Sequence, residues 1–535
     1  MPDLPHSFDS IDVSPTPFAQ PLELRLQAAS PRYRPPPTPL VSILIHFGAL
    51  LLWAVLFAMA FHAGGLLAWS VGVAYITYDT LLLSFVFWQT WSLRKNPALG
   101  NAPLKQPRAA SGHTTLGIVV AAHNEMLVLP VTLAALLSQS DAPDLIVIAD
   151  DGSTDGTAEL LQRVYGLALP EWGMLGPASA AHPTLRWLRL PHGGKARALN
   201  AAISQINTDT VLTVDADTLL EPDAIGAVRA AFAADNRLVA ATGVLAPVCD
   251  RSWRGRLFQW FQTYEYIRSF LSRYAWMQVG GLLLISGAFA GFRRSALLEV
   301  GGFDDDCLVE DYELIHRLHR FSALNGRGWS IQVLGDARAR TEAPAGIGAF
   351  LRQRQRWFGG FLQTQLWYRD MVGNRRYGAL GLAMLPVKAI DTLQPLYGLT
   401  AFVLLLVYIG DALAGALFGP ARQGVSAAGG MMASDNTGPV LGAVALVISG
   451  KIVVDVLFHL WSVRLYQGWA ESQGGLAQPG QSKTGLGWAF LAALAEPFTF
   501  QILRHLGAIW GWLGFLTGAR AWGRQSRGGL LPPPN

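Results

Sequence analysis

The apolar residues divide this chain into membrane-like stretches near both ends and a mixed segment between them. Two apolar runs, over residues 40–61 and 66–92, are each long enough to cross a bilayer about 30 Å thick. The link between them is so short that we predict a transmembrane hairpin over residues 40–92. Further transmembrane helices are predicted over residues 380–466, and another apolar stretch covers residues 486–518.

The segment between the apolar ends, residues 113–370, alternates short β-branched runs with helical patterns. Three of these runs end in polar clusters, in "GIVVAAHNE", "DLIVIADDGSTDG" and "TDTVLTVDADT". Buried parallel strands have this pattern, and functional groups gather at their carboxyl ends. We therefore expect a Rossmann-like, doubly wound α/β domain inserted between transmembrane α-helices.

Two stretches within this segment are amphipathic, residues 253–271 and 349–369. In the first, aromatic and aliphatic residues recur every three or four positions, and arginines flank that stripe. This pattern favours an interfacial helix on the membrane surface. A helix that faces the core of the α/β domain is the alternative.

The terminal segments give weaker signals. Residues 1–39 are rich in proline and serine, which predicts a flexible tail. Residues 486–518 are interrupted by polar residues, and a single crossing there would place the basic tail 519–535 outside, against the charge rule. A re-entrant or interfacial segment is therefore predicted over 486–518, with a transmembrane segment as the alternative.

Composition supports a membrane protein with a sizeable soluble part. Hydrophobic residues make up 51% of the chain and charged residues 15%, whereas soluble domains are about a quarter charged. Basic residues flank the first hairpin on both sides and not at its tip, so the positive-inside rule predicts that the α/β domain lies in the cytoplasm. A multi-pass protein of the inner (plasma) membrane is expected, because the sequence carries no organelle signal. No basic run is interleaved with aromatics, so nucleic acid is not an expected partner. The two cysteines, Cys249 and Cys307, indicate neither a disulfide framework nor a zinc site.

The pair Asp215 and Asp217 follows the third apolar run. Residues two apart in a strand point to one side, so both carboxylates could hold a divalent cation against a diphosphate. A solvated turn with capping carboxylates is the alternative.

Two further clusters follow predicted strands. Asp150 and Asp151 precede a glycine turn, where carboxylates could accept hydrogen bonds from a base or ribose, although turn and N-cap chemistry favours the same residues. Lys195 follows two glycines in "HGGKARALN" and could meet a phosphate. This is not a Walker A sequence, so ATPase chemistry is unsupported.

Two later motifs add an acid pair and a basic–aromatic group. Glu310 and Asp311 precede a helical run, where a carboxylate could take the proton of an attacking hydroxyl or merely favour the helix N-terminus. "RQRQRWFGG" supplies Gln353, Arg356 and Trp357. Arginine suits diphosphate oxygens and tryptophan offers a flat face to a sugar ring, whereas an amphipathic surface helix is the alternative.

Ionisable residues also lie inside the apolar stretches, namely Asp79, the pair Lys388 and Asp391, and the pair Lys451 and Asp455. Such groups are costly in a membrane and usually face a partner or a wet cavity. They predict either a polar path for a growing glycan or local charge pairing within the helix bundle.

Over residues 113–370, the order of an Asp-Asp pair, an Asp-x-Asp motif, a Glu-Asp pair and a Gln-x-x-Arg-Trp motif resembles the processive membrane-embedded family 2 glycosyltransferases. That family includes the synthases of poly-N-acetylglucosamine, hyaluronan, chitin and cellulose. The resemblance implies a cytosolic GT-A domain and inverting transfer from a UDP-sugar to a growing polysaccharide, processive and coupled to export. Transfer of a single sugar to a lipid or lipid-linked acceptor is the alternative, and a catalytically dead scaffold is a third.

The resemblance also implies roles for individual residues. Asp311 is the implied catalytic base, with Glu310 beside it, and Asp215 and Asp217 are the implied ligands of Mg²⁺ or Mn²⁺. The implied nucleotide-sugar-binding residues are Glu125, Asp150, Asp151, Lys195, Asp215, Gln353, Arg356 and Trp357. The implied acceptor-binding residues are Ser286, Gly287 and Trp357. Many family members carry threonine where this chain has Val309, but the acid pair itself is intact.

The expected partners follow from the same resemblance. They are a UDP-sugar donor, a glycan or lipid-linked acceptor and membrane lipids, with accessory export subunits as an open addition. The transferred sugar, the linkage and the product length are left open by the sequence.

Overall fold

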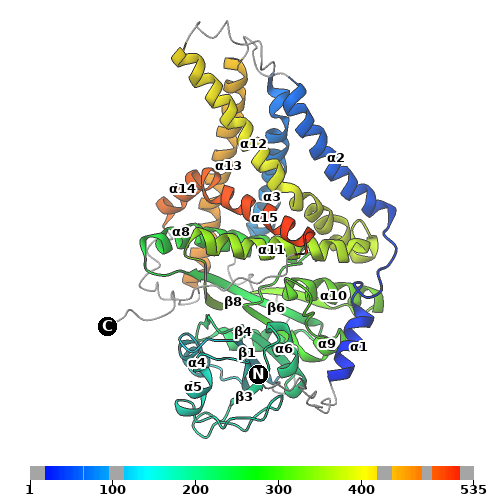
Figure 1. Cartoon of the computed structure of the whole chain (residues 1–535), viewed down its shortest axis with the longest axis vertical. Helices are drawn as coiled ribbons and strands as arrows, with labels where there is room; N and C mark the ends of the chain where they lie inside the picture. The colour runs from blue at the N-terminus through cyan, green and yellow to red at the C-terminus, as the bar shows by residue number, and fades with distance from the viewer. Residues whose placement is uncertain (1–18, 64, 95–113, 419–436, 473–484, 519–535) are drawn as a thin grey trace, which may run out of the picture.

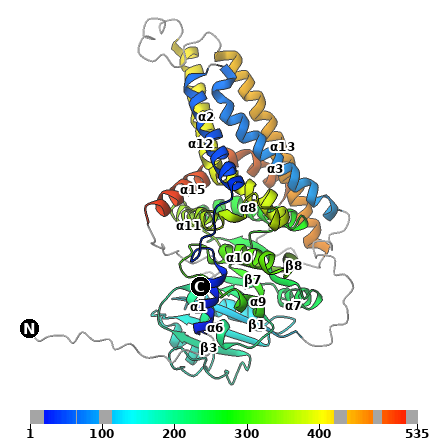
Figure 2. The same cartoon turned by 90° about the vertical axis from the view of Figure 1, so that its right-hand side faces the viewer.

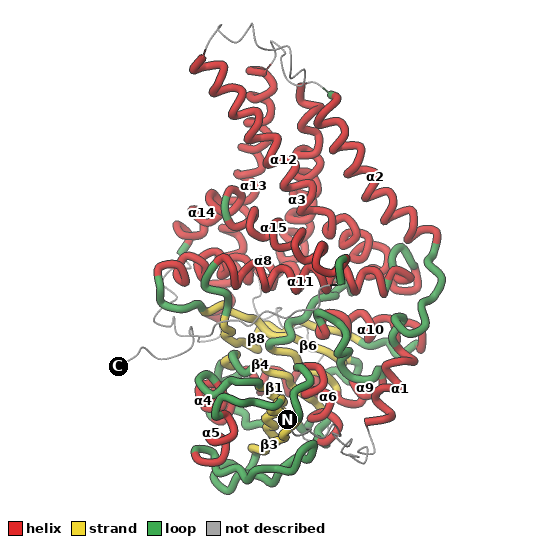
Figure 3. Tube along the Cα trace, viewed as in Figure 1, coloured by secondary structure: helices red, strands yellow, loops and turns green. Residues whose placement is uncertain are grey.

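The computed structural model describes residues 19–63, 65–94, 114–418, 437–472 and 485–518. Along its long axis these residues form three levels (Figure 1). An α/β domain lies at one end, a bundle of long apolar helices lies at the other, and a layer of helices crosses between them. Figure 3 shows that the strands are confined to the first level.

The α/β domain is built on one eight-stranded sheet in the order β3-β2-β1-β4-β7-β6-β8-β5. The strands are β1 (Leu116–Ala122), β2 (Leu145–Asp151), β3 (Leu185–Leu190), β4 (Thr210–Asp215), β5 (Thr218–Leu220), β6 (Leu238–Val248), β7 (Phe289–Arg293) and β8 (Ser330–Glu342). β3, β2, β1 and β4 run parallel, whereas β7 is antiparallel to both of its neighbours and β5 is antiparallel to β8. The three apolar runs of the sequence are β1, β2 and β4, so the parallel half of the sheet is as predicted.

The parallel register explains why the predicted polar clusters meet. Ala122 at the end of β1 is level with Asp150 of β2, and Ala121 is level with Asp215 of β4. The carboxyl ends of parallel strands lie at one edge of a sheet, where open α/β sheets bind their ligands. Helices of this domain are α4 (Leu129–Leu137), α5 (Thr157–Arg163), α6 (Lys195–Gln205), α7 (Ala224–Ala234), α9 (Arg294–Glu299) and α10 (Glu310–Asn325).

The described residues include four helices that are long and apolar enough to cross a membrane, over Leu40–His62, Leu67–Arg94, Leu380–Gly410 and Leu441–Gln467. They belong to α2 (Leu40–His62), α3 (Ser70–Thr90), α12 (Leu385–Phe418) and α13 (Thr437–Ser472). Figure 2 shows these four helices gathered into one bundle that extends away from the sheet. Large apolar side chains remain exposed on the bundle, among them Leu50, Leu51 and Leu52. Lipid contact would cover them.

The middle level consists of α8 (Trp253–Gln278), α11 (Ile347–Trp367), α14 (Leu486–Ala495) and α15 (Phe500–Leu516) (Figure 1). The N-terminus of α8 is capped by Ser252, whose hydroxyl accepts a hydrogen bond from Gly255 N. Only the start of the predicted apolar stripe is exposed, and the exposed fraction of Trp253 is 65%. Tyr264, Ile267 and Leu271 are buried. The stripe therefore contacts protein over most of its length. Its placement on a membrane surface stays a prediction.

The last apolar stretch is a bent pair of helices. α14 and α15 meet at 45° around a short turn, Glu496–Phe498. Pro497 supplies no backbone N–H there, and the carboxylate of Glu496 pairs with Arg268 of α8 and lies 3.2 Å from His459 Nε2 of α13. The bend falls where the sequence is interrupted. A re-entrant or interfacial position for the pair stays a prediction.

The prediction of a flexible tail over residues 1–39 needs correction for its described part. Residues 1–18 lie outside the described residues, but helix α1 (Ala19–Ala29) packs beside α9 (Figure 2). Leu22 and Leu26, four residues apart, are buried, and Arg25 donates to the carbonyl of Leu298 at 3.2 Å. An apolar helical face outweighs the proline-rich composition here. The predicted tail 519–535 also lies outside the described residues.

Candidate active site

A cavity of about 930 Å³ opens at the carboxyl ends of β1 and β4. Residues of α8, α10, α11 and α15 complete its wall, so it lies between the sheet and the middle level. The sequence-predicted residues that line it are Glu125, Asp151, Lys195, Asp215, Asp217, Ser286, Gly287, Glu310, Asp311, Gln353, Arg356 and Trp357. Asp150 is the exception. The fold thus brings almost all of the predicted residues to one place.

Lys195, the first residue of α6, is the central cation of this cavity. Its ammonium forms an ion pair with Asp215, lies 3.7 Å from Glu310 Oε1 and donates to the carbonyl of Gly287 at 3.2 Å. Burial opposes its charge, but the carboxylates of Asp215, Glu310 and Asp311 outweigh burial and raise the pKa of Lys195. Lys195 is therefore a fixed positive charge at the end of β4.

For Glu310, in contrast to Lys195, the effect of burial on the pKa outweighs that of the nearby opposite charge. Its side chain is buried, and this burial raises the pKa of the Glu310 carboxyl, while Lys195 opposes the shift and the charge of Asp311 adds to it. A carboxyl in this setting holds a proton more readily than an exposed one.

Asp311 is held in one orientation by backbone N–H groups. Its Oδ2 accepts a hydrogen bond from Gly287 N at 2.7 Å, and its Oδ1 accepts one from Tyr312 N at 2.9 Å. Asp311 also lies in the first turn of α10, where the helix dipole favours a negative charge. These donors fix the position of the Asp311 carboxylate at the wall of the cavity.

The hydrogen bond from Gly287 requires glycine at that position. A Cβ on residue 287 would lie 2.7 Å from Asp311 Oδ2 and 3.0 Å from its Cγ. Both separations are shorter than van der Waals contact. The neighbouring Ser286 is fixed by a hydrogen bond from its N–H to Thr242 Oγ1 at 3.3 Å.

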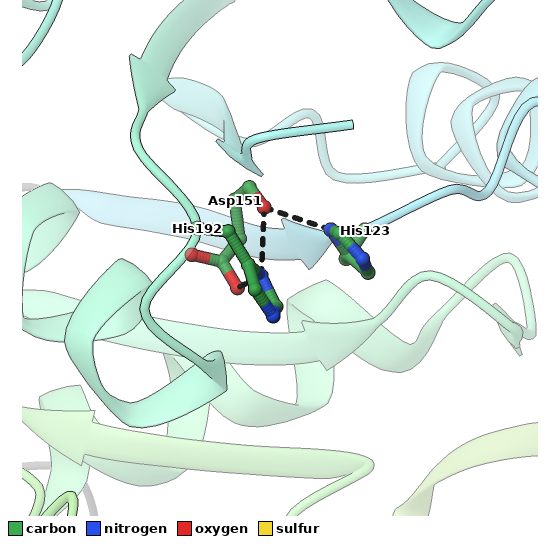
Figure 4. Close-up of side chains that lie close together, drawn as sticks. All are labelled: His123, Asp151 and His192. Atoms are coloured by element: carbon green, nitrogen blue, oxygen red, sulfur yellow. Dashed lines mark hydrogen bonds and ion pairs between the residues drawn. The ribbon is translucent and has the colours of Figure 1, made fainter. Parts of the chain in front are cut away.

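At the carboxyl end of β2, the Asp151 carboxylate is bound by the loop that precedes α6. Oδ1 accepts from Gly193 N at 2.7 Å, Oδ2 accepts from Gly194 N at 2.9 Å, and His192 Nδ1 lies 2.9 Å from Oδ2. His123 Nδ1 lies 2.8 Å from the carbonyl oxygen of Asp151, and the two imidazole rings stack with centroids 4.2 Å apart (Figure 4). Asp151 thereby fixes the loop that delivers Lys195. Sequence reasoning favoured a structural hydrogen-bonding role for His123, which this contact fits, but it did not identify His192.

Asp150 and Glu125 differ in their access to the cavity. The Asp150 carboxylate is buried and accepts from Ser153 N at 2.9 Å, away from the cavity. Glu125 is buried but lines the cavity. The adjacent Asn124 has a positive φ of 58°, and its side-chain oxygen accepts from Thr154 N at 2.7 Å, which ties the loops after β1 and β2 together.

A magnesium or manganese site needs oxygen ligands, because both ions are hard cations. Asp215 and Asp217 both line the cavity, and paired carboxylates are what these hard cations prefer. Asp215 is ion-paired with Lys195, so a cation already occupies its surroundings. Within the described residues, two groups of three have spacing suited to a metal ion, His123–Asp151–His192 and Asp304–Asp305–Asp306. The first is already hydrogen-bonded within the loop described above, and the second does not line the cavity. The assignment of Asp215 and Asp217 as metal ligands stays a prediction.

Arg32, from the N-terminal part of the chain, forms ion pairs with the loop that precedes the acid pair. Arg32 lies 3.2 Å from Asp304 Oδ1 and 2.7 Å from Asp306 Oδ2. Burial, reinforced by the charge of Glu313 and opposed by Arg32, raises the pKa of Asp304 to about 6. This loop therefore carries a carboxyl that titrates near neutral pH.

Helix α11 presents its motif to the cavity in an arrangement the sequence did not reveal. Trp357 packs against Arg354, whose guanidinium lies 4.4 Å from the ring centroid and 2.7 Å from Glu265 Oε2. Burial, opposed by Glu265, lowers the pKa of Arg354. Three arginines alternate at residues 352, 354 and 356, so spacing alone could not say which one supports the tryptophan.

Comparisons with known proteins agree with this geometry. The model of glycosyl transferase family 2 matches residues 117–301, and that of glycosyl transferase family group 2 matches residues 210–418. The chain carries a family 2 glycosyltransferase domain. The resemblance to this family and the GT-A-like mixed α/β fold are thereby confirmed.

Two relatives of this chain are poly-beta-1,6-N-acetyl-D-glucosamine synthases. That of Staphylococcus epidermidis is 28% identical over 301 residues, which cover 56% of this chain and 66% of the relative. That of Staphylococcus aureus strain COL is 28% identical over 294 residues, which cover 55% and 63%. The chain thus spans less than two thirds of the length of these relatives. Among solved structures, the mannosyltransferase PcManGT from Pyrobaculum calidifontis, in complex with GDP-Man and Mn²⁺, matches 81% of this chain and 99% of its own at 19% identity, with a TM-score of 0.45.

A second cavity, of about 460 Å³, adjoins the first and runs between α3, α12 and α13. The intramembrane ionisable residues noted in the sequence line it. Lys388 lies 2.6 Å from Asp391, and Lys451 lies 2.8 Å from Asp79 and also pairs with Asp455. The two cavities share wall residues from α8 and α12, so they adjoin one another between the sheet edge and the apolar bundle.

Proposed function

We propose that this chain transfers a sugar from a UDP-sugar to a hydroxyl of a growing polysaccharide at the cytoplasmic face of the inner membrane. One observation carries the proposal: the cavity that holds the acid pair shares wall residues with a second cavity between the apolar helices, and ionisable side chains line that second cavity. A product made at the first cavity would pass these side chains on its way into the bundle. Processive addition coupled to export is proposed on this ground.

The chemistry assigned to Asp311 is that of a general base. It takes the proton of the acceptor hydroxyl while the hydroxyl oxygen bonds to the anomeric carbon of the donor. The bond from that carbon to the diphosphate breaks, and UDP leaves with the electron pair. Attack from the face opposite the leaving group inverts the anomeric configuration, as in inverting glycosidases, where water replaces the sugar hydroxyl.

The leaving group is stabilised on the other side of the cavity. Asp215 and Asp217 would hold Mg²⁺ or Mn²⁺, and such a cation neutralises charge on the departing diphosphate. Lys195 and Arg356 bind diphosphate oxygens. Asp151 and Glu125 line the nucleotide side, with Asp151 acting through the loop that it fixes. Ser286, Gly287 and Trp357 border the acceptor.

The names of the relatives make N-acetylglucosamine the first donor sugar to test. The experiment is UDP release from the purified full-length protein with Mg²⁺ or Mn²⁺ and a panel of UDP-sugars. We expect release with one sugar and its loss in Asp311→Asn, which keeps the shape of the side chain but cannot accept the proton. Release that survives in Asp311→Asn would contradict the assignment of the base.

Product length separates processive synthesis from the alternative, transfer of one sugar to a lipid-linked acceptor. Radiolabelled product from the same reaction is resolved on a gel. We expect a high-molecular-weight polymer. A product that migrates as a lipid bearing one sugar would replace the polysaccharide proposal with the alternative.

A further inference from the structure

Arg273 of α8 lies where the two cavities meet and lines both of them. Four other charged residues share this position: Glu265, Lys388, Asp391 and Arg504. Each of those four is paired. Glu265 lies 2.7 Å from Arg354 and 3.5 Å from Arg504, and Lys388 lies 2.6 Å from Asp391.

Arg273 differs from them, because it makes no hydrogen bond and no ion pair to any residue that the structure describes. Its Nε is shut off from solvent and has no acceptor. Burial lowers the pKa of Arg273, although Tyr266 and Asp311 oppose the shift. A guanidinium has five N–H donors in a planar fork; the Arg273 side chain is half-buried, and its Nε–H is a buried donor without an acceptor, which costs stability.

An unpaired donor group that faces a ligand cavity is usually completed by the ligand. The donor's diphosphate has its own cations at the end of β4, Lys195 among them, whereas Arg273 borders the second cavity as well. Arg273 is therefore placed on the acceptor side. On α11, Gln353 Oε1 is another buried polar atom of the first cavity without a partner.

We infer that Arg273 is a specificity-determining residue that binds an exocyclic acyl oxygen on the acceptor glycan. A sugar hydroxyl satisfies a guanidinium poorly, whereas a carbonyl or carboxylate oxygen accepts its hydrogen bonds well. The N-acetyl group of an amino sugar and the carboxylate of a uronic acid share this chemistry, and plain hexoses lack it. This inference rests on the proposed function, because it names the class of acceptor at that same site.

The test is equilibrium binding of oligosaccharides to the full chain in detergent, by calorimetry and without donor. Three ligands of equal length are compared: an N-acetylglucosamine oligomer, a glucuronate-containing oligomer and a glucose oligomer. We expect at least one of the first two to bind about 10-fold or more tightly than the glucose oligomer, which is the scale of one hydrogen bond to a charged group. Which of them binds more tightly identifies the source of the acyl oxygen.

Two variants make the test specific. Arg273→Met should remove the preference and bring the three affinities together, while Arg273→Lys, which keeps one charge but not the fork, should restore part of it. Arg256→Met, on the exposed face of the same helix, is the matched control and should keep the preference. Because Arg273 has no partner to abandon, Arg273→Met should unfold at the same temperature as the wild type or higher.

Several outcomes would overturn the inference. They are equal binding of all three oligomers by the wild type, no binding of any oligomer, an equal loss of all three affinities in Arg273→Met, and a lower unfolding temperature of that variant. UDP affinity is measured in parallel. If UDP fails to bind, the proposed function fails, whereas intact UDP binding with no acyl preference refutes only the role of Arg273.

Discussion

Adding a single methyl group at residue 287 should disable the proposed base without touching its carboxylate. In Gly287→Ala, the new Cβ would lie 2.7 Å from Asp311 Oδ2 and 3.0 Å from its Cγ. Gly287 does not have a positive φ, so alanine can adopt the backbone conformation, and the steric conflict with Asp311 is the whole perturbation. Asp311 must move by several tenths of an ångström or more and loses its hydrogen bond from Gly287 N.

The size of the effect follows from that displacement. Misplacing a reacting group by about 1 Å costs up to roughly 100-fold in rate, so we expect kcat for UDP release to fall between about 10-fold and 100-fold. Overpacking at one site costs about 1–3 kcal/mol of folding stability, which leaves the protein folded. UDP affinity should change little, because Gly287 touches the base rather than the nucleotide.

The assay measures kcat for UDP release and, separately, UDP affinity. Gly346→Ala is the matched control, since a Cβ there meets nothing within 4 Å and the backbone is extended. A Gly287→Ala variant with wild-type kcat would refute the argument that this close contact positions the base. A loss of UDP affinity equal to the loss of kcat would show instead that the whole cavity had been disrupted.

Two further predictions concern charged groups near the acid pair. Lys195→Met should weaken UDP binding by about 10- to 100-fold, because a charge-assisted contact of about 1.5–3 kcal/mol is lost, and unchanged affinity in a titration would contradict the placement of the diphosphate beside Asp215. Asp304→Asn should flatten the dependence of stability on pH. The folded pKa of Asp304, about 6, exceeds its ordinary value of 3.8, so the folded protein keeps a proton that the unfolded chain releases, and stability declines as pH rises from about 4 to above 6. The decline attributable to Asp304 is about 3 kcal/mol at most, and thermal unfolding of wild type and variant across this range would detect it, with parallel curves contradicting the assignment.

Much of the sheet could be predicted because β1, β2 and β4 are buried on both faces and are therefore continuous apolar runs. The rest of the sheet lacks that signal. β8 alternates buried residues with arginines, and its pairing with β6 joins segments about 90 residues apart with register shifts. Nothing local in the sequence specifies that pairing.

The candidate site was predictable to the extent that it follows strand ends. Adjacent residues of a strand point to opposite faces, so of Asp150 and Asp151 only one could face the cavity, and the sequence did not say which. His192, Arg354 and Arg273 were not identified, because their roles depend on neighbours from distant elements. The absence of a partner for Arg273, in particular, is a property of the packed structure.

The docking of α1 constrains how the chain is threaded. α1 precedes the first apolar helix, yet Arg25 is hydrogen-bonded to Leu298, which follows the second. Two residues in direct contact lie on one side of a membrane, so the chain between them must cross an even number of times. α2 and α3, which are long and apolar enough to cross, would supply two crossings. The predicted hairpin and the predicted position of the α/β domain are therefore linked without use of the charge rule, since one cannot change without the other.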